Sequence, residues 1–338
     1  MNIIIPMAGW GTRLRPHTLT VPKPLIKVAG KPVVQRLVET IAASVEAPVE
    51  NVVFVIKSAF GPEIEQKLLD LAAALGMKGH IRYQEQALGT AHAIYMAAEF
   101  LEGNTFVAYA DTLFDGRIEI DPEADSMIVV KKVDRPEQFG VVQLDEYGYI
   151  KQFVEKPKEF VSDLAIVGIY YFRDGAVLRN EIQYLMDNGI MKSGEYQLTD
   201  ALENMLRKGM KFKPAGIDRW MDFGNYKAAV ATNRDVLEIA ARKGEKLVSD
   251  KAVLENARII PPCYVEEGVV VRNATVGPYV SLHAGTRVEG GRIEESLIGE
   301  NNLLENSLLK GSMIGSHTHV KDFEGELSLG DYSKILRK

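Results

Sequence analysis

The chain has 338 residues, of which 46% are hydrophobic and 25% are charged, a composition typical of globular proteins. Its 40 basic and 46 acidic residues give a formal net charge of −6, which argues against a nucleic acid as the main partner. The single cysteine, Cys263, excludes an intramolecular disulfide framework and a zinc site built from cysteines, and no apolar run approaches the roughly 20 residues that span a bilayer. We therefore expect a cytoplasmic protein of two domains, with no nucleic-acid and no membrane partner.

Up to about residue 240, short β-branched runs alternate with segments of helical periodicity, which is the pattern of an α/β sheet with crossover helices. Strands are predicted at residues 2–7, 52–56 and 106–110, and helices at 33–45, 61–75 and 90–101, where apolar residues recur three and four apart. Further strands are predicted at 127–133, 140–144, 150–154 and 165–172, followed by helices from about 198 and at 226–243. The pattern predicts a Rossmann-like fold with a mixed, mostly parallel sheet.

The last part of the chain follows a different period, in which an aliphatic residue recurs at every fifth or sixth position. These residues are Val253, Ile259, Val265, Val271, Val276, Leu282, Val288, Ile293, Ile298, Leu304, Leu309 and Ile314. The period is too long for a helix or a flat strand and matches a hexapeptide β-helix, in which each aliphatic residue points into a coil. A β-sandwich, the alternative, would show alternation within longer strands. We predict domains at residues 1–245 and 246–338.

The loop after the first predicted strand is the most informative motif. Its glycines, Gly9 and Gly11, allow the backbone to approach a phosphate closely and present N–H groups to its oxygens. It is neither a Rossmann fingerprint, because Leu14 stands where the third glycine belongs, nor a Walker loop. Arg13 follows at once, and Lys23 comes next between two prolines that keep its backbone extended. The loop therefore supplies a guanidinium and an ammonium group at fixed spacing for a phosphate ligand.

Seven segments, in order, resemble the sugar-1-phosphate nucleotidylyltransferases, also called nucleoside-diphosphate-sugar pyrophosphorylases. They are the Gly-x-Gly-Thr-Arg-Leu-x-Pro-x-Thr loop with Pro-Lys-Pro-Leu, Gln84 with Leu88–Ala93, Asp111 at a strand end, Phe139–Val142 with Val154–Pro157, Gly168–Tyr170, Glu195–Asp200, and Trp220–Gly224. Together they cover nearly all of residues 1–240. The resemblance is greatest to glucose-1-phosphate thymidylyl- and uridylyltransferases that carry a C-terminal left-handed β-helix, and it implies a nucleotidyltransferase domain followed by that β-helix.

The resemblance implies that the phosphate of a sugar 1-phosphate attacks the α-phosphorus of a nucleoside triphosphate, giving a nucleoside-diphosphate sugar and pyrophosphate. The attacking phosphate is already ionised at neutral pH, so the chemistry needs charge neutralisation and positioning and no general base. Mg²⁺ held by Asp111 and Asp222 would bridge the phosphates.

The same resemblance assigns roles to individual residues. Arg13 would stabilise the leaving pyrophosphate, Lys23 would lie near the α-phosphate, and Lys156 would hold the sugar phosphate. Nucleotide binding is implied for Ala8, Gly9, Gly11, Thr12, Gln84, Gly89 and Thr90. Sugar-phosphate binding is implied for Gly140, Glu155, Lys156, Gly168 and Tyr170, with Glu155 accepting from hydroxyls and Tyr170 closing over the phosphate.

Two positions depart from the family pattern. Ala110 precedes the first metal-site aspartate, where many members have glycine, and Asn225 stands where threonine is common after Asp-x-Gly. Both departures leave the aspartates in place.

The choice of base rests on Gln84, five residues before Gly89, the spacing at which pyrimidine-using relatives place a glutamine. An amide offers one donor and one acceptor to O4 and N3–H of uracil or thymine. We expect dTTP or UTP as the donor and glucose 1-phosphate as the acceptor. Alternatively, Gln84 caps its strand or faces solvent, and backbone groups near Gly89 select the base. A mannose-1-phosphate guanylyltransferase is the alternative activity.

The predicted β-helix leaves a second activity open. Such coils form acyltransferases with a histidine base, for which His283 or His317 would serve, but four coils or so are few for that task. The other interpretation is an assembly module that makes a homo-oligomer. We also expect that a fragment ending near Gly244 folds and binds nucleotide but assembles less. A silent sensor of nucleotide sugars is disfavoured, because Arg13, Lys23 and both aspartates are present.

Overall fold

The computed structural model describes residues 1–336, and the contacts within it divide the chain into two compact units. The first, which we call the sheet unit, consists of Met1–Gly9 and Leu37–Trp220. The second, the coil unit, consists of Trp10–Arg36 together with the residues from Met221 onward. The division passes through the glycine-rich loop, between Gly9 and Trp10. A boundary at residues 245 and 246 therefore stays a prediction, and contacts group Trp10–Arg36 with the coil.

The large sheet of the sheet unit is mixed, as the sequence predicts. Its strands are β1 (Asn2–Pro6), β4 (Asn51–Ile56), β5 (Lys78–Tyr83), β6 (Thr105–Ala108), β8 (Ser126–Lys132), β9 (Gly140–Leu144), β10 (Ile150–Glu155), β11 (Leu164–Phe172) and β12 (Phe212–Gly216). They follow the order β10-β9-β11-β6-β1-β4-β5, with β8 paired to β11 and β12. The strands β6, β1, β4 and β5 are mutually parallel, and β11 runs antiparallel to β6. Every predicted strand is found.

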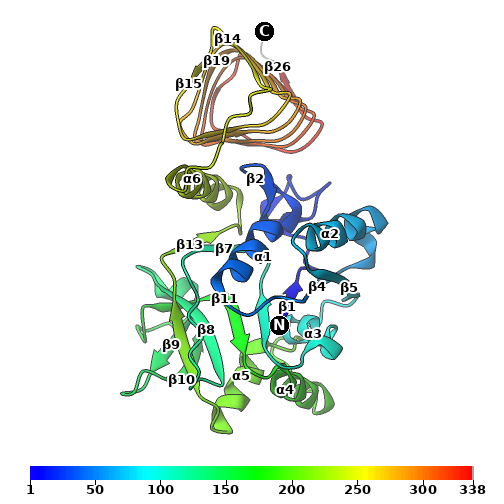
Figure 1. The fold of residues 1–338 in the computed structure, drawn as a ribbon, viewed down its shortest axis with the longest axis vertical. Coiled ribbons are helices and arrows are strands. Elements are labelled where there is room, and N and C mark those ends of the chain that lie inside the picture. Colours follow the sequence, from blue (N-terminus) through cyan, green and yellow to red (C-terminus); the bar gives the residue numbers. More distant parts are fainter. Residues whose placement is uncertain (337–338) are drawn as a thin grey trace. The chain divides into compact units, whose positions relative to one another are not determined.

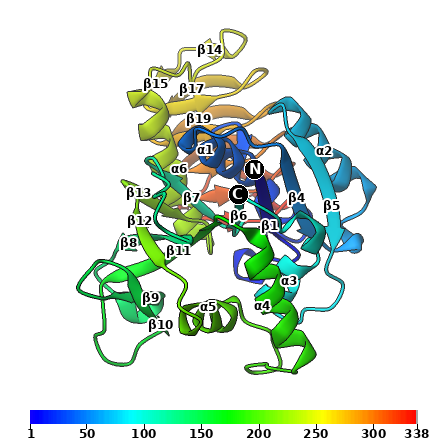
Figure 2. The same ribbon diagram turned by 60° about the horizontal axis from the view of Figure 1, so that its bottom comes forward.

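Helices lie on both sides of these strands (Figures 1 and 2). They are α1 (Val33–Ser44), α2 (Pro62–Ala74), α3 (Thr90–Tyr95), α4 (Gly175–Asp187) and α5 (Leu198–Arg207). Apolar residues of α3, α4 and α5, among them Ile94, Ile182 and Leu202, share one buried cluster with Ile4 and Val107 of the sheet. This burial is the main favourable term for the sheet unit, at roughly 25 cal/mol per Å² of apolar surface removed from water.

Strands β5, β7 (Thr112–Asp115) and β12 and helix α4 of the sheet unit are absent from the sequence prediction, and one predicted helix is shorter. Strand β5 contains Lys78, Gly79 and Arg82 and lies at the sheet edge, so it has no aliphatic run. Helix α4 begins with a glycine, but Asp174 caps it by accepting from the backbone N–H of Ala176 at 3.0 Å. The helix predicted at 90–101 ends at Tyr95 and is followed by a 3₁₀ turn.

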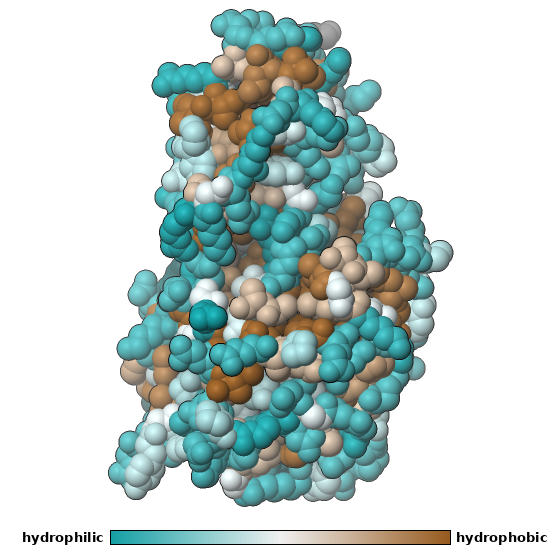
Figure 3. All heavy atoms as spheres, in the orientation of Figure 1, coloured by the Kyte–Doolittle hydropathy of each residue, from teal (hydrophilic) through white to brown (hydrophobic). Residues whose placement is uncertain are grey.

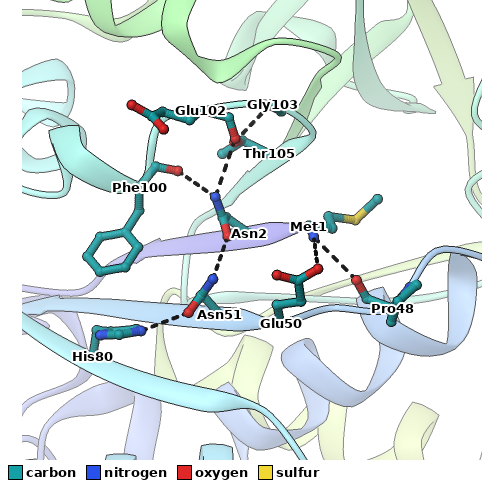
Figure 4. Close-up of polar contacts among 10 residues, drawn as sticks. All are labelled: Met1, Asn2, Pro48, Glu50, Asn51, His80, Phe100, Glu102, Gly103 and Thr105. Carbon is teal, nitrogen blue, oxygen red and sulfur yellow. Dashed lines mark hydrogen bonds and ion pairs between the residues drawn. The ribbon is translucent and has the colours of Figure 1, made fainter.

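The amino-terminal ends of the parallel strands are joined by a polar network (Figure 4). The Asn2 side chain donates to the carbonyl of Phe100 at 2.8 Å and accepts from the Asn51 amide at 3.0 Å. The Asn51 oxygen in turn lies 2.9 Å from His80 Nε2. These side chains satisfy one another and neighbouring carbonyls, so this edge of the sheet has a structural role. The candidate functional residues of the sheet lie at its opposite, carboxyl edge.

The remaining short elements connect the larger ones. They are the 3₁₀ turns η1 (Thr12–Leu14), η2 (Lys23–Leu25), η3 (Ser58–Phe60), η4 (Ala98–Phe100) and η5 (Pro136–Gln138), and the strands β2 (Lys27–Val28), β3 (Lys31–Pro32), β7 (Thr112–Asp115) and β13 (Arg219–Asp222).

The C-terminal part of the coil unit is a parallel coil with three flat sides (Figure 1). Its strands are β14 (Val253–Glu255), β15 (Arg258–Ile259), β16 (Cys263–Val265), β17 (Val270–Val276), β18 (Val280–Leu282), β19 (Arg287–Glu294), β20 (Leu297–Ile298), β21 (Leu303–Lys310), β22 (Met313–Ile314), β23 (His319–Lys321), β24 (Glu324–Gly325), β25 (Ser328–Leu329) and β26 (Lys334–Leu336). The strands pair in parallel from one turn of the coil to the next, which confirms a β-helix.

The register of the coil matches the sequence period. Val253 pairs with Val270, which is 17 residues on, and His319 pairs with Lys334, which is 15 residues on. Three steps of five or six residues give the same length. We call each such turn a rung. The predicted aliphatic residues from Val265 to Ile314 form one buried cluster inside the rungs. The left-handed sense of the coil stays a prediction.

Helix α6 (Tyr226–Arg242) packs against β18, β20 and β22 of the coil. Its Asn233 is buried and accepts a hydrogen bond from the Ser281 hydroxyl at 2.6 Å. Apolar side chains also reach the surface of the coil (Figure 3), and on the first strand, β14, Val253 and Leu254 are 41% and 42% exposed. Leu254, and not Val253, pairs with the buried Val271, so the inward position on β14 is one residue later than the sequence period predicts. Leu254 is exposed because no rung precedes it.

Among residues 1–336, no helix is both long and apolar enough to span a bilayer.

Candidate active site

Asp111 lies at the carboxyl end of a central strand, three residues after the end of β6. This is the edge at which open α/β sheets bind ligands. The turn that carries Asp111 is anchored on both sides. The backbone N–H of Tyr109 donates to the carbonyl of Gly168 at 3.0 Å, and the Thr112 hydroxyl donates to the carbonyl of Val167 at 2.9 Å. The carboxylate is thus held on a fixed turn, as the motif predicts.

Tyr109, two residues before Asp111, was not anticipated from the sequence. Its ring meets that of Tyr170 edge to face, with 5.9 Å between centroids, and its hydroxyl bonds to the side chain of Thr90. Burial raises the pKa of Tyr109, and the charges of Asp111 and Glu155 raise it further, against the opposing effect of Thr90. The hydroxyl therefore stays protonated. Its only signal in the sequence is its place at the strand end before Asp111.

Gly168 and Tyr170 pack against Tyr109 from β11. Gly168 has φ +94°, and a Cβ there would lie 3.0 Å from Cδ2 of Tyr109, so only glycine suits the position. Tyr170 is almost fully buried, and its burial, followed by the nearby Tyr109 and Glu155, raises its pKa. Contact between Tyr170 and a sugar phosphate stays a prediction.

Gln84 is buried at the end of β5, where it holds the loop that precedes α3. Its side-chain nitrogen donates to the carbonyl of Gly89 at 3.0 Å and lies 3.1 Å from Nδ1 of His92. Burial lowers the pKa of His92, so its ring is neutral and Nδ1 can accept. Both amide donors of Gln84 are therefore engaged within the protein, which leaves its oxygen to accept from a base. The two-point contact predicted with a pyrimidine would require one of these bonds to break.

Gly89 and Thr90 are fixed by a neighbouring segment around Tyr196. A Cβ at Gly89, which has φ +102°, would lie 2.4 Å from the carbonyl oxygen of Tyr196. Tyr196 donates its N–H to the carbonyl of Leu88 at 2.8 Å, and the Thr90 hydroxyl accepts from the N–H of Leu198 at 3.1 Å. Thr90 thus links this segment to Tyr109.

Three of the residues predicted near the sugar, from β9 and β10, are neighbours. Gly140 of β9 pairs with Glu155 of β10, and a Cβ at Gly140 would lie 2.9 Å from Oε2 of Glu155. The next residue, Lys156, has φ +43°, and its N–H donates to the carbonyl of Phe139 at 3.1 Å. A lysine in the left-handed region is uncommon and marks a constrained backbone. Glu155 and Lys156 both have exposed side chains.

Ala8 and Gly9 end the sheet-unit part of the glycine-rich loop. The preceding Met7 donates its N–H to the carbonyl of Val55 at 2.8 Å, which continues the β1–β4 pairing, and Ala8 is buried. A Cβ at Gly9 would meet no heavy atom of the protein within 4 Å. The chain's own packing thus does not require a glycine there, and open space beside the backbone suits the close approach of a phosphate.

The coil unit contains the rest of the loop, with Gly11, Thr12, Arg13 and Lys23. Gly11 has φ +61°, and a Cβ there would lie 3.0 Å from Cβ of Lys23. Its carbonyl accepts from the Thr18 hydroxyl at 2.9 Å. Thr12 and Arg13 form η1, with exposed side chains. The structure therefore brings Gly11 and Lys23 together.

Asp222 ends β13 in the coil unit, and its carboxylate accepts from the N–H of Gly224 at 3.1 Å. The Thr232 hydroxyl of α6 donates to the backbone carbonyl of Asp222 at 2.6 Å. Asn225, one of the two departures from the family pattern, caps α6 by accepting from the N–H of Ala228 at 3.1 Å. The asparagine therefore acts as the N-cap of α6, a position that favours this residue type.

The donor chemistry of Asp111 and Asp222 fits the predicted Mg²⁺. Carboxylate oxygens are hard ligands, and Mg²⁺ is commonly bound through one or two carboxylates, with waters and substrate phosphates as the other ligands. Within residues 1–336, no group of three or more His, Cys, Asp and Glu side chains could hold a metal ion. A site built on these two residues would therefore depend on the substrate for its remaining ligands.

The histidines of the coil are engaged in structural contacts. His283 is buried, its Nδ1 lies 2.7 Å from the carbonyl of Ile298, and its Nε2 lies 3.4 Å from the N–H of Gly30. Burial lowers its pKa, so a neutral ring with the proton on Nδ1 satisfies both contacts. His317 stacks on Tyr332, with 4.9 Å between centroids.

The fold is thus an α/β sheet with candidate ligands at its carboxyl edge, followed by a parallel β-helix. Residues 2–239 match the family model described as nucleotidyl transferase, and the chain belongs to that family. The family resemblance predicted from the motifs is thereby confirmed.

The relatives differ in length and in the activity for which they are named. The chain is 30% identical over 279 residues to the bifunctional protein GlmU of Methanococcus maripaludis, which covers 80% of this chain and 62% of that protein. It is 30% identical over 302 residues to a glucose-1-phosphate thymidylyltransferase of Streptomyces griseus, covering 83% and 82%. A crystal structure of a candidate glucose-1-phosphate thymidylyltransferase from Bacillus anthracis with sucrose matches 69% of this chain and 93% of that one. Its TM-score is 0.57 at 23% identity, which supports the fold.

Proposed function

We propose that the chain transfers a nucleotidyl group from a nucleoside triphosphate to a sugar 1-phosphate and releases pyrophosphate. The observation that carries the proposal, beside membership of the family, is the set of contacts around Tyr109. That residue bonds to Thr90 of the predicted nucleotide segment, packs on Gly168 and Tyr170 of the predicted sugar segment, and precedes Asp111. Groups for both substrates thus belong to one connected part of the sheet unit.

The reaction forms a bond between a phosphate oxygen of the sugar 1-phosphate and the α-phosphorus, and it breaks the bond to the β-phosphate. Arg13 neutralises the pyrophosphate as it leaves, Lys23 neutralises the α-phosphate, and Lys156 orients the sugar phosphate. The backbone at Gly9 and Gly11 carries N–H groups for the triphosphate. No residue has to remove a proton, because the attacking oxygen is already ionised.

Asp111 and Asp222 are the proposed ligands of Mg²⁺, which when bound would offset the charge of the substrate phosphates. Membership of the family is the reason to expect dependence on a divalent metal. The identity of the ion follows from the oxygen donors.

The proposed donor is dTTP or UTP and the proposed acceptor is glucose 1-phosphate, as the thymidylyltransferase relative supports. The contacts of Gln84 weaken the argument for a pyrimidine, because both of its amide donors are engaged within the protein. Its oxygen could accept equally from N3–H of a pyrimidine or N1–H of guanine. Mannose-1-phosphate guanylyltransferase activity is therefore kept as the alternative.

A second, acetyl-transferring activity in the coil is the other alternative, since one relative is named bifunctional. The contacts of His283 count against it, because a base for acyl transfer needs a ring nitrogen that faces a substrate. We propose a cytoplasmic homo-oligomer, with the exposed side chains of β14 as the support for assembly.

A pyrophosphate-release screen tests the function. Purified protein with Mg²⁺ is given dTTP, UTP, GTP, ATP or CTP against glucose, N-acetylglucosamine and mannose 1-phosphates. We expect the fastest release with dTTP or UTP and glucose 1-phosphate. A tenfold or greater preference for GTP would contradict the base, and no release with any pair would contradict the transfer activity itself.

A further inference from the structure

The segment that follows the glycine-rich loop is attached to the coil by side-chain contacts at both of its ends. All of these residues belong to the coil unit. The contacts pair residues from 234 positions apart (Gly30 and Tyr264) to 314 positions apart (Pro16 and Gly330), so they are tertiary contacts and no consequence of local sequence.

The first group of contacts lies around the β2–β3 hairpin. The Lys27 ammonium lies 2.6 Å from Oε1 of Glu300, which follows β20. At the tip of the hairpin, Gly30 has φ +83°, and a Cβ there would lie 2.3 Å from the hydroxyl of Tyr264 in β16. The N–H of Gly30 also faces His283, after β18. The hairpin tip can therefore fit the coil only as glycine.

The second group lies at the other end of the segment, on the last rung. His17 is buried, and its Nε2 lies 3.1 Å from the hydroxyl of Ser328. The Thr20 hydroxyl donates to the Asp331 carboxylate at 2.6 Å. Pro16 packs on the coil backbone so closely that a Cβ at Gly330 would lie 2.8 Å from the Pro16 Cβ.

Of the residues proposed to face the phosphates, Lys23 lies between these two groups in sequence, and Gly11 and Arg13 directly precede the group at residues 16–20. Thr18, between His17 and Thr20, bonds to the carbonyl of Gly11. Gly11 in turn packs against Lys23, and the carbonyl of Lys23 accepts from the N–H of Ile26 at 3.1 Å, next to Lys27. A short path of contacts thus joins the coil to Gly11 and to Lys23.

We propose that the coil serves as a positioning element for the phosphate loop, with Lys27, Glu300 and His17 as positioning residues for Gly11, Arg13 and Lys23. The proposal rests on the nucleotidyl-transfer function proposed above. It gives the β-helix a role in turnover within one chain, distinct from assembly and from a second activity. Lys27 and Glu300 touch no substrate in this scheme and act through the backbone of the loop.

Charge reversal of the Lys27–Glu300 pair tests the proposal in the full-length chain. Lys27 and Glu300 are each more than a third exposed, so removing one charge would have little effect. Lys27→Glu, by contrast, sets two carboxylates against each other. We expect about a tenfold loss of kcat in Lys27→Glu, and a change of less than threefold in KM for the sugar phosphate. The Lys27→Glu/Glu300→Lys double variant should recover most of the loss, and Lys27→Arg should resemble the wild type.

Hydrogen exchange supplies a readout that is independent of activity. Lys27→Glu should increase exchange in peptides that cover residues 10–31 and leave the other coil peptides unchanged. Lys251→Glu is the matched control, because Lys251 forms a 2.8 Å ion pair with Glu267 in the coil and has no part in the loop contacts. It should change neither kcat nor loop exchange.

The outcomes separate this proposal from the proposed function. Unchanged kinetics and unchanged loop exchange in Lys27→Glu would overturn the positioning role, as would a double variant no better than the single one. If the wild type transfers no nucleotidyl group, the proposed function fails, and exchange still reports whether the coil holds the loop. If Lys27→Glu does not fold, Glu300→Lys, which sets two ammonium groups against each other, and the double variant provide the same comparison.

Discussion

The sheet unit and the coil unit both depend on parallel strand pairs, but they use glycine and asparagine for different purposes. In the sheet unit, Gly89 directly precedes α3 and Gly168 lies within β11, and each lets one specific neighbour approach. Gly89 admits the backbone of Tyr196, and Gly168 admits the ring of Tyr109. These glycines shape a candidate site.

In the coil, the equivalent residues repeat at one corner of every rung. Asn256, Asn273, Gly290, Asn306 and Asp322 all have positive φ and follow one another at 16 or 17 residues. Their side chains interact along the corner, as in the 2.8 Å hydrogen bond from Asn256 to Asn273. They serve the turn geometry of the repeat. The candidate residues of the coil unit come instead from Trp10–Arg36 and from Asp222, outside the repeat.

The largest expected effect is on stability, and it tests how far local unfolding extends from a core substitution in each unit. Leu304 is 1% exposed and faces Val288 and Val320 on adjacent rungs, so Leu304→Ala should cost about 3 kcal/mol. Because a rung contacts only its neighbours, increased hydrogen exchange should stay within β19, β21, β23 and residues 16–30. Leu202→Ala in α5, also buried, is the counterpart in the sheet unit. Equal increases throughout both units in Leu304→Ala would contradict local unfolding.

The second effect is a loss of kcat, and it tests whether both units contribute a metal ligand. Asp111→Asn and Asp222→Asn should each reduce kcat by about a hundredfold or more, roughly 2.7 kcal/mol, because a charge that offsets phosphate is lost. A chelator should abolish wild-type turnover. Asp174→Asn is the control, since asparagine also caps a helix well. A fully active Asp222→Asn enzyme that still needs metal would confine the ligand set to the sheet unit.

The third effect is a pH dependence of stability that is specific to the coil unit. Burial lowers the pKa of His17 to about 4, against an ordinary value of 6.5. The unfolded chain therefore takes up a proton that the folded chain resists, so stability falls as pH drops from 6.5 towards 4. Between pH 6.5 and 5 the loss should be about 1.6 kcal/mol, because the slope rises to 1.36 kcal/mol per pH unit only below pH 6.5.

His17→Gln removes this titration while keeping a polar side chain that can bond to Ser328. Urea unfolding of the wild type and the variant at several pH values should give curves that converge at low pH. Parallel curves across that range would show that His17 is protonated as readily in the folded chain as in the unfolded one.

The smallest effect concerns the sheet unit alone. Tyr109→Phe keeps the packing on Gly168 and Tyr170 but removes the hydroxyl that bonds to Thr90. We expect about a tenfold loss of kcat, roughly 1.4 kcal/mol, with little change in thermal stability. Tyr171→Phe, which removes a hydroxyl bonded to Asn104 at 2.9 Å, is the control and should retain activity. An equal loss in both variants would assign the effect of Tyr109→Phe to general packing.

The extent to which sequence predicted these features differs between the two units. The coil follows from its period, because each rung repeats the same inward positions, and Asp111 follows from its place after a strand. Tyr109 and the contacts of Gln84 do not follow, since they depend on how separate connections meet in space. The sequence also gives no indication that the glycine-rich loop divides between two units.

That division changes what a truncation after about Gly244 should do. The sequence alone predicts a folded fragment that binds nucleotide. Without the coil, however, His17, Thr20 and Lys27 would lose Ser328, Asp331 and Glu300. We now expect such a fragment to bind nucleotide weakly even where its sheet unit is folded.

Because one segment is attached to the coil at several rungs, the number of rungs between the attachment points has to match the length of that segment. Gly30 contacts the rung that carries Tyr264, Lys27 contacts the rung that carries Glu300, and Pro16 contacts the rung that carries Gly330. These points lie on β16, after β20 and after β25, four strand spacings from first to last, or about 19 Å at 4.8 Å per spacing. Deletion of one whole rung between them would leave a well-formed coil that is too short for the segment. Added rungs beyond either attachment point would be tolerated, so the number of rungs in between is set by the loop.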